Sequence, residues 1–227
     1  MPHLIVTRPV GQALRLGELL GARVPQFDLM YLPLLSIVPN IDQRDAKRLK
    51  EIVSSVDLAV FVSPNAIECT MRMLADAWPL AVPVAVVGGG SVEALQRHGI
   101  DVAHGYTVIA PADPQEWDSE GLWRQIQHYC QDWSGQRILF LKGVGGRAWL
   151  GEQFLKAGAE LEAIQSYRRV PLDRQAPIWD HVKMINPATA LCLMTSSEAV
   201  SHFDHVLKES HWGIGWHEQI SLLCSHP

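Results

Sequence analysis

Short runs of consecutive apolar residues recur along the chain, and each run ends in a turn of small or polar residues. Runs that are apolar throughout and rich in Leu, Val and Ile are typical of strands buried on both faces of a parallel sheet. The runs cover residues 4–6, 58–62, 84–87, 138–141, 190–194 and 220–224. The pattern therefore predicts six buried strands.

Most of these runs are followed by a segment with helical periodicity. Residues 11–23 place four leucines mainly on one side, and residues 65–74 do the same with Ile, Met and Leu. Residues 91–98 begin with Ser91, a capping residue, and end before Gly99, a favourable stop. The repeated order of strand, turn and helix predicts an α/β fold with right-handed crossovers.

Segments of the chain resemble one another, which indicates an internal repeat. Residues 6–24 are similar to residues 141–161, residues 61–67 to residues 194–200, and residues 86–91 to residues 222–227. We therefore expect two similar parallel-sheet lobes of flavodoxin-like or Rossmann-like type, visited by the chain in a circularly shifted order.

The shifted order predicts the domain boundaries. The first lobe is discontinuous and combines residues 1–35 with residues 172–227, and the second covers residues 38–166. Two proline-containing linkers, residues 31–39 and 165–172, form a two-stranded connector. A cleft between such lobes is a preferred place for a small ligand.

The same comparison makes a further prediction about the first lobe. In the second lobe the turn at residues 88–91 is followed by a helix and a further segment, whereas the matching residues 225–227 are the last of this sequence. The first lobe is therefore expected to lack its last helix.

Composition narrows the functional classes. The 227 residues carry 19 Lys and Arg against 24 Asp and Glu, a net charge of −5, which argues against a nucleic-acid partner. The four cysteines show no CxxC spacing, and no apolar run approaches the roughly 20 residues that span a bilayer. A strand pattern starting at Leu4 leaves no room for a signal peptide. We expect a cytoplasmic protein without a membrane partner.

Five turns after predicted strands contain candidate binding residues. They are Thr7-Arg8-Pro9, Ser63-Pro64-Asn65, Gly88 to Ser91, Gly143 to Gly146, and Thr195-Ser196-Ser197. Open α/β sheets bind ligands at the carboxyl ends of their strands, where backbone N–H groups and helix dipoles attract carboxylate or phosphate. Helix capping explains any single Ser or Thr. Five such turns together favour an anionic ligand.

Two other chemistries receive weaker support. Gly143 to Ala148 matches the dinucleotide fingerprint G-x-G-x-x-A, with Glu160 or Glu162 about 20 residues on. The partner repeat, Thr7 to Gly11, lacks the glycines. The histidines near the end of the chain, and the eight tryptophans, are interpreted as surface and packing residues, and no metal site is predicted.

The order and spacing of these motifs resemble the uroporphyrinogen-III synthase family over essentially the whole chain. The matching segments are residues 6–12, 61–66, 86–95, 119–122, 145–147, 167–169 and 195–200. Ser91 stands where the family typically has Thr, which keeps the hydroxyl. The family also continues past a turn that resembles residues 225–227 into another helix, which this sequence lacks.

The resemblance implies a lyase that uses neither metal nor organic cofactor. Its substrate is hydroxymethylbilane, a linear tetrapyrrole with eight carboxylates, which loses water and closes to uroporphyrinogen III with inversion of the last ring. We expect a monomer, with hydroxymethylbilane synthase as a candidate partner. A dinucleotide-binding α/β protein and a non-catalytic tetrapyrrole-binding paralogue are the alternatives.

The resemblance also assigns candidate site residues. Tyr167 matches the tyrosine that the family places at the cleft, so it is the expected general acid, although packing of the linker would also explain an aromatic residue there. Arg168 is a further candidate for a charge-assisted hydrogen bond. The expected substrate-binding residues are Thr7, Arg8, Ser63, Pro64, Asn65, Gly88, Ser91, Gly145, Gly146, Arg147, Thr195, Ser196 and Ser197.

Overall fold

The computed structural model describes residues 1–146 and 148–224, and the chain divides into two compact units. Unit 1 combines Met1–Ile37 with Arg169–Pro227, and unit 2 is Val38–Arg168. The chain passes from one unit to the other in β3 (Leu35–Pro39) and returns in β8 (Glu160–Pro171), and these strands are hydrogen-bonded neighbours. Unit 1 is thus built from the two ends of the chain and unit 2 from its middle.

Unit 1 is built on a parallel sheet with the strand order β10-β9-β1-β2. Its elements are β1 (His3–Val6), α1 (Val10–Gly21), β2 (Asp28–Tyr31), α7 (Ile178–Met184), the 3-10 turn η4 (Pro187–Thr189), β9 (Ala190–Met194), α8 (Ser197–Glu209), α9 (Gly213–Gln219) and β10 (Ser221–Cys224). Strands β1, β9 and β10 are apolar runs recognised in the sequence, whereas β2 was not among the predicted strands.

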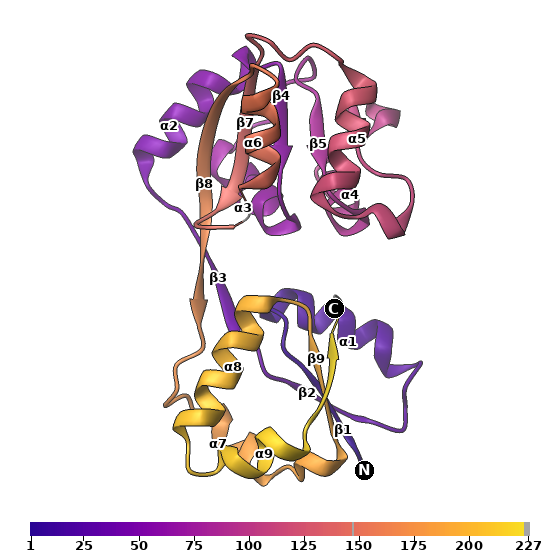
Figure 1. Cartoon of the computed structure of the whole chain (residues 1–227), viewed down its shortest axis with the longest axis vertical. Helices are drawn as coiled ribbons and strands as arrows, with labels where there is room; N and C mark the ends of the chain where they lie inside the picture. Colours follow the sequence, from indigo (N-terminus) through magenta and orange to yellow (C-terminus); the bar gives the residue numbers. More distant parts are fainter. Residues whose placement is uncertain (147, 225–227) are drawn as a thin grey trace. The chain divides into compact units, whose positions relative to one another are not determined.

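One face of this sheet packs against α7, α8 and α9 (Figure 1). Ile5 and Cys192 come from neighbouring strands and are fully buried there, against Trp179, Phe203 and Trp216 from the three helices. The rings of Trp179 and Phe203 stack with centroids 6.3 Å apart, and Phe203 meets Trp216 edge-on at 6.4 Å. Aromatic pairs of this kind contribute about 0.5–1.5 kcal/mol each beyond the area they bury, so they help hold the helices on the sheet.

Unit 2 is built on a larger sheet with the strand order β3-β8-β7-β4-β5-β6, in which the pairs from β8 to β6 are parallel. Its further elements are α2 (Gln43–Ile52), η1 (Val53–Ser55), β4 (Leu58–Phe61), α3 (Pro64–Leu74), β5 (Val84–Val86), α4 (Gly89–Arg97), η2 (Val102–His104), β6 (Val108–Ile109), η3 (Pro114–Glu116), α5 (Ser119–Tyr129), β7 (Arg137–Gly143) and α6 (Trp149–Lys156).

Phe154 is the centre of the core on one face of the unit 2 sheet. Its ring is fully buried and meets the rings of Trp123, Trp133 and Phe140 edge-on, with centroids 5.0, 5.2 and 5.9 Å away. These residues come from α5, the loop after it, and β7, so a single α6 side chain joins helix, loop and sheet. This packing holds α5 and α6 against the sheet, and the hydrogen bonds between its parallel strands fix the positions of the turns that follow them.

The two sheets have the same internal order. Strands β5-β4-β7-β8 of unit 2 correspond to β10-β9-β1-β2 of unit 1, and every pair in both series is parallel. The predicted α/β fold with two parallel sheets is confirmed. The predicted helices at residues 11–23, 65–74 and 91–98 are α1, α3 and α4.

One burial prediction was wrong. The run at residues 220–224 was expected to be buried on both faces, but all four residues of β10 are exposed, with Leu222 at 48% and Leu223 at 50%. The reason is its place in the sheet, because β10 is an edge strand that pairs with β9 on one side. Its counterpart β5 lies between β4 and β6 and is buried throughout.

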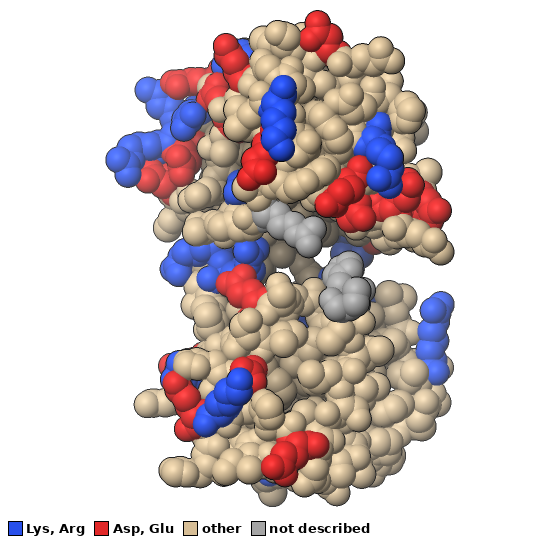
Figure 2. Space-filling model, viewed as in Figure 1, with Lys and Arg blue, Asp and Glu red and all other residues tan. Residues whose placement is uncertain are grey.

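Within the described residues, no helix is both long enough and apolar enough to cross a membrane. On the face seen in Figure 2, Lys and Arg side chains alternate with Asp and Glu. That face therefore offers no large basic surface of the kind that binds a phosphate backbone.

Candidate functional site

In unit 2 the predicted site residues of neighbouring strands come together at the carboxyl edge of the sheet. Ser63 follows β4, Gly88 follows β5, and Gly145 and Gly146 follow β7, and these strands are adjacent and parallel. The turns after β4 and β5 are in contact, since a Cβ built on Gly90 would lie 3.8 Å from Cγ of Pro64.

Ser63 caps α3 with its side chain. Its Oγ accepts a hydrogen bond from the backbone N–H of Ala66 at 3.2 Å, and Pro64 occupies the first helical position, where no N–H is needed. Ser63 Oγ also lies 3.0 Å from the hydroxyl oxygen of Tyr167. Asn65, the next residue of this turn, is half-buried. The cap therefore connects the end of β4 to a side chain of β8.

Tyr167 is held at this edge by an irregularity between β7 and β8. Lys142 pairs with Gln165, but Gly143 pairs with Tyr167, so Ser166 is an extra residue in β8. Such bulges re-aim the side chains that follow them. Tyr167 is buried, with 3% of its surface exposed, and its ring lies over Gly143. The expected general acid is thus a tightly packed side chain beside the α3 cap.

The loop after β7 opens toward solvent beyond Gly143. Gly145 and Gly146 adopt φ values of 76° and 95°, in the left-handed region that favours glycine, and a Cβ on either would meet nothing within 4 Å. Val144 donates its backbone N–H to the carbonyl of Tyr167 at 2.9 Å. This leaves a small, open backbone surface beside Tyr167. Arg147, the next predicted residue, lies outside the described residues.

The glycine turn after β5 is covered by an aromatic ring. Gly88 caps α4 without a side chain, and a Cβ on Gly89 would lie 2.5 Å from Cη2 of Trp117. Trp117 lies between η3 and α5 and is 42% exposed. Ser91, in the first turn of α4, is buried at 4%. The sequence interpretation took the tryptophans as packing residues and missed Trp117, although a Gly-Gly pair was a signal that something bulky lies close.

In unit 1, Thr7 and Arg8 follow β1. Thr7 is 2% exposed, and its hydroxyl donates to the carbonyl of Leu193 in the neighbouring strand β9 at 2.7 Å. This hydrogen bond uses the hydroxyl to join two strands. Arg8 is half-buried, its buried Nε has no hydrogen-bond partner among the described residues, and burial lowers the pKa of the guanidinium. A partly desolvated cation with an unused N–H is suited to an anion.

The turn after β9 is a second serine cap. Ser196 accepts a hydrogen bond from the backbone N–H of Ala199 at 3.4 Å, at the start of the 13-residue helix α8. Glu198 in the first turn is ion-paired with Arg169. Thr195 is half-buried and Ser197 is exposed. The N-terminus of α8 is therefore capped and carries its own anionic side chain. Arg168 is exposed and belongs to unit 2.

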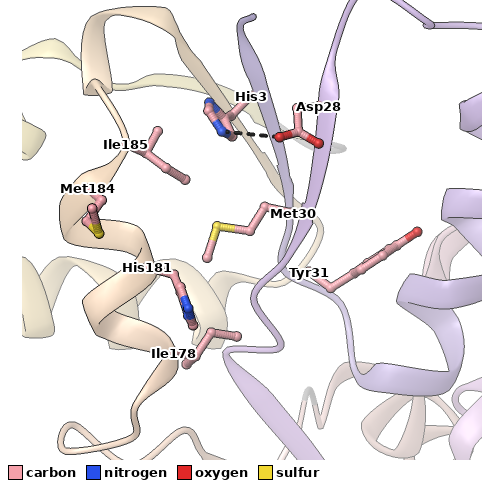
Figure 3. A pocket seen from close by; sticks show the side chains of 8 residues that line it. All are labelled: His3, Asp28, Met30, Tyr31, Ile178, His181, Met184 and Ile185. Atoms are coloured by element: carbon pink, nitrogen blue, oxygen red, sulfur yellow. Dashed lines mark ion pairs between the residues drawn. The ribbon is translucent and has the colours of Figure 1, made fainter.

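Unit 1 also contains a cavity of about 450 Å³, separate from all the predicted site residues (Figure 3). It lies between β1, β2 and α7, and at one end His3 and Asp28 form an ion pair at 3.5 Å. Met30 and His181 point into it from opposite sides (Figure 3). Most of its lining is apolar, in contrast to the turns that are expected to bind an anionic ligand.

The described residues contain no group of three His, Cys, Asp or Glu side chains that could hold a metal ion. Two of the histidines near the end of the chain have separate partners: His202 hydrogen-bonds to the carbonyl of Leu172 at 2.9 Å, and His217 pairs with Asp204 at 3.0 Å. Burial is the main cause of a lowered pKa for His202. These residues stabilise α8 and its neighbours.

A dinucleotide-binding motif at Gly143 to Ala148 would need its first glycine in the turn that follows the strand. Gly143, the first glycine of that motif, is part of β7 and lies under the ring of Tyr167, so it is not open to a pyrophosphate. Glu162 forms ion pairs with Arg48 and Arg137, both at 2.9 Å, and hydrogen bonds from these residues lower the pKa of its carboxyl. One of the two acidic residues that could hold a ribose is therefore already engaged, and the other, Glu160, is exposed at the start of β8.

A family model matches most of the chain, and solved structures share its fold. The family model described as uroporphyrinogen-III synthase HemD matches residues 22–227. A solved mutant uroporphyrinogen III synthase from the extremely thermophilic bacterium Thermus thermophilus is 11% identical, with a TM-score of 0.60, and the match covers 99% of this chain and 84% of the other. The uroporphyrinogen-III synthetase of Helicobacter pylori is 11% identical, with a TM-score of 0.55 and coverages of 99% and 83%. At these identities the structures support the fold alone. No curated protein matches the chain significantly.

Proposed function

The chain belongs to the uroporphyrinogen-III synthase family, and from this membership we propose how its own residues convert hydroxymethylbilane to uroporphyrinogen III in tetrapyrrole biosynthesis. The single observation that carries the proposal is the 3.0 Å contact between Tyr167 and Ser63 at the edge where the turns of unit 2 meet.

The reaction sets the tasks of the protein. The terminal hydroxyl of the substrate leaves as water after protonation, and the pyrrole nitrogen lone pair stabilises the resulting azafulvene cation. The last pyrrole attacks this cation through its substituted carbon, and the spiro intermediate rearranges to the inverted ring with loss of a proton. The reactive cation forms within the substrate, so the protein must chiefly position the chain and exclude water.

Backbone amides and Arg8 are proposed to bind the substrate carboxylates. The net charge of −5 rules out attraction by the protein as a whole, so binding depends on local sites. The helix N-terminus after Ser63 and the open backbone at Gly145 and Gly146 supply N–H groups. The unpaired Nε of Arg8 supplies a charge-assisted hydrogen bond.

Tyr167 is proposed as the proton donor to the departing hydroxyl. Tyr167 is the tyrosine that the family resemblance places at the site, and its hydroxyl lies beside the α3 cap and the open glycine loop. Its low exposure shelters the donated proton from water, which suits a reaction through a cation that water would trap.

The test is a coupled assay from porphobilinogen with hydroxymethylbilane synthase, scoring the type III isomer against the spontaneous type I isomer. Tyr167→Phe is expected to lower kcat by roughly 10²-fold or more, the range of general acid catalysis. Tyr129→Phe, at an exposed position at the end of α5, is the matched control and should keep the wild-type rate. A wild-type rate for Tyr167→Phe would remove this residue from the mechanism. If the wild-type protein formed no more isomer III than a reaction without it, a non-catalytic paralogue would be favoured.

We further propose that the chain acts as a monomer in the cytoplasm and receives its unstable substrate from hydroxymethylbilane synthase. The four unpaired cysteines fit a reducing compartment. Sedimentation of the wild type alone and with that enzyme would test both the monomer and the transfer complex.

A further inference from the structure

Ser63 makes two contacts through one oxygen atom. Its Oγ accepts from the N–H of Ala66 at 3.2 Å and lies 3.0 Å from the hydroxyl of Tyr167, a residue 104 positions later in the chain. A serine hydroxyl has one hydrogen to donate, and the amide already occupies one of its two acceptor positions. Ser63 can therefore either donate its hydrogen to the Tyr167 oxygen or accept the phenolic hydrogen at its second acceptor position.

The helix end favours Ser63 as the donor. An oxygen that accepts from an amide at the positive end of a helix has its own O–H polarised, which strengthens the bond that this O–H donates. We propose that Ser63 is a positioning residue that donates a hydrogen bond to the Tyr167 oxygen and so turns the phenolic hydrogen toward the substrate. This inference rests on the proposed role of Tyr167 as proton donor.

The rest of the Tyr167 side chain is already fixed by other contacts. The bulge at Ser166 sets where the side chain leaves β8, and the ring lies against Gly143, which has no side chain to displace it. Ser166 is fully buried, and its hydroxyl lies 3.4 Å from the carbonyl oxygens of Ala66 and Lys142, which ties the bulge to the first turn of α3. Ser63 adds a hydrogen bond at the phenolic oxygen itself.

The proton balance gives Ser63 a role in both halves of the reaction. When Tyr167 gives its proton to the terminal hydroxyl, the C–O bond breaks, water leaves and the substrate becomes the azafulvene cation. The phenolate oxygen keeps the hydrogen bond from Ser63. Ring closure and rearrangement release one proton from the substrate, and this proton returns to Tyr167, so no other reactant is needed.

Ser63→Gly is the sharpest variant, because it removes the hydroxyl while keeping a residue type that caps a helix. Glycine costs only a little relative to serine at such a position, and Gly88 caps the neighbouring helix α4 in this same protein. We expect Ser63→Gly to lower kcat by about 10-fold with KM within about 2-fold, a part of the general acid effect. Ser63→Thr keeps the hydroxyl and should restore most of the rate. Asp42→Gly, the same kind of change at the cap of α2, is the control for a lost side-chain cap.

The double variant Ser63→Gly, Tyr167→Phe separates the outcomes. If Ser63 acts through Tyr167, adding Ser63→Gly to Tyr167→Phe leaves the formation of isomer III unchanged. An equal loss in both backgrounds would mean that Ser63 contacts the substrate itself, and a wild-type kcat for Ser63→Gly would mean that it positions nothing; either result overturns the proposal while the role of Tyr167 stands. A wild-type rate for Tyr167→Phe alone would overturn both.

Discussion

Gly143 and Tyr167 are partners across β7 and β8, and the tyrosine ring lies so close to the glycine that a Cβ at position 143 would be 2.6 Å from the ring atom Cζ. No side chain fits between them. The bulge at Ser166 creates this pairing, since it moves Tyr167 rather than Ser166 opposite Gly143.

Gly143→Ala is therefore expected to displace the Tyr167 ring. We expect a loss of about 1–3 kcal/mol in the free energy of unfolding, typical of an overpacked core. A shift of about 1 Å in a positioned group costs up to roughly 10²-fold in rate, so kcat should fall more than KM changes. Denaturant unfolding and the coupled assay measure both. Gly151→Ala, where the added Cβ would lie 3.4 Å from Leu161, is the control and should behave as wild type.

Gly89→Ala should be destabilising because of Trp117. The added Cβ would lie 2.5 Å from the indole, so the ring must move, at a cost of about 1–3 kcal/mol. Trp117→Ala removes the obstacle, and the double variant should lose less stability than the sum of the single variants. A double-mutant cycle of unfolding free energies measures this coupling. Strictly additive losses would contradict the contact.

Arg8→Met should weaken substrate binding without lowering the free energy of unfolding. Burial lowers the pKa of the Arg8 guanidinium and leaves its Nε unpaired, so an apolar side chain of similar length is expected to be neutral or to stabilise the fold by about 1 kcal/mol or more. The lost charge-assisted hydrogen bond should raise KM by roughly 10-fold or more. Arg23→Met, at an exposed position after α1, is the control. An unchanged KM for Arg8→Met would remove Arg8 from the binding site.

Cys192 should make the protein less stable in alkali. Burial raises the pKa of this thiol from 9.0 to about 12, so between these values the folded state holds a proton that the unfolded state has lost. Its contribution is fully present below pH 9 and is lost as the pH rises toward 12, with a slope of about 1.4 kcal/mol per pH unit. Unfolding free energies between about pH 8.5 and 11 should fall less steeply for Cys192→Ala than for the wild type. An equally steep fall for Cys192→Ala and the wild type would contradict this prediction.

Much of the fold follows from local patterns in the sequence. The run at residues 190–194 is the strand β9, and the helical pattern at residues 65–74 is α3 to within one residue. Strand and helix depend on apolar periodicity over about ten residues, which is visible without knowledge of the fold. The turns after the strands could be recognised for the same reason, because Ser63 and Ser196 have the residue type and position of helix caps.

The function of individual side chains at those turns depended on contacts between distant parts of the chain. Thr7 and Arg8 are neighbours in sequence, yet the Thr7 hydroxyl donates to β9, while the Arg8 Nε has no partner in the described part of the chain. The sequence placed β10 in a buried core, but its position at the sheet edge exposed it.

Sequence alone thus determined the parallel α/β fold, the internal repeat and the family, because these depend on the order and spacing of short patterns. Tertiary structure alone decided that Ser63 faces Tyr167 and that Gly143 makes room for the ring. The physical reason is distance along the chain: a side chain acquires its partner only when strand pairing and register bring together residues that no local pattern connects.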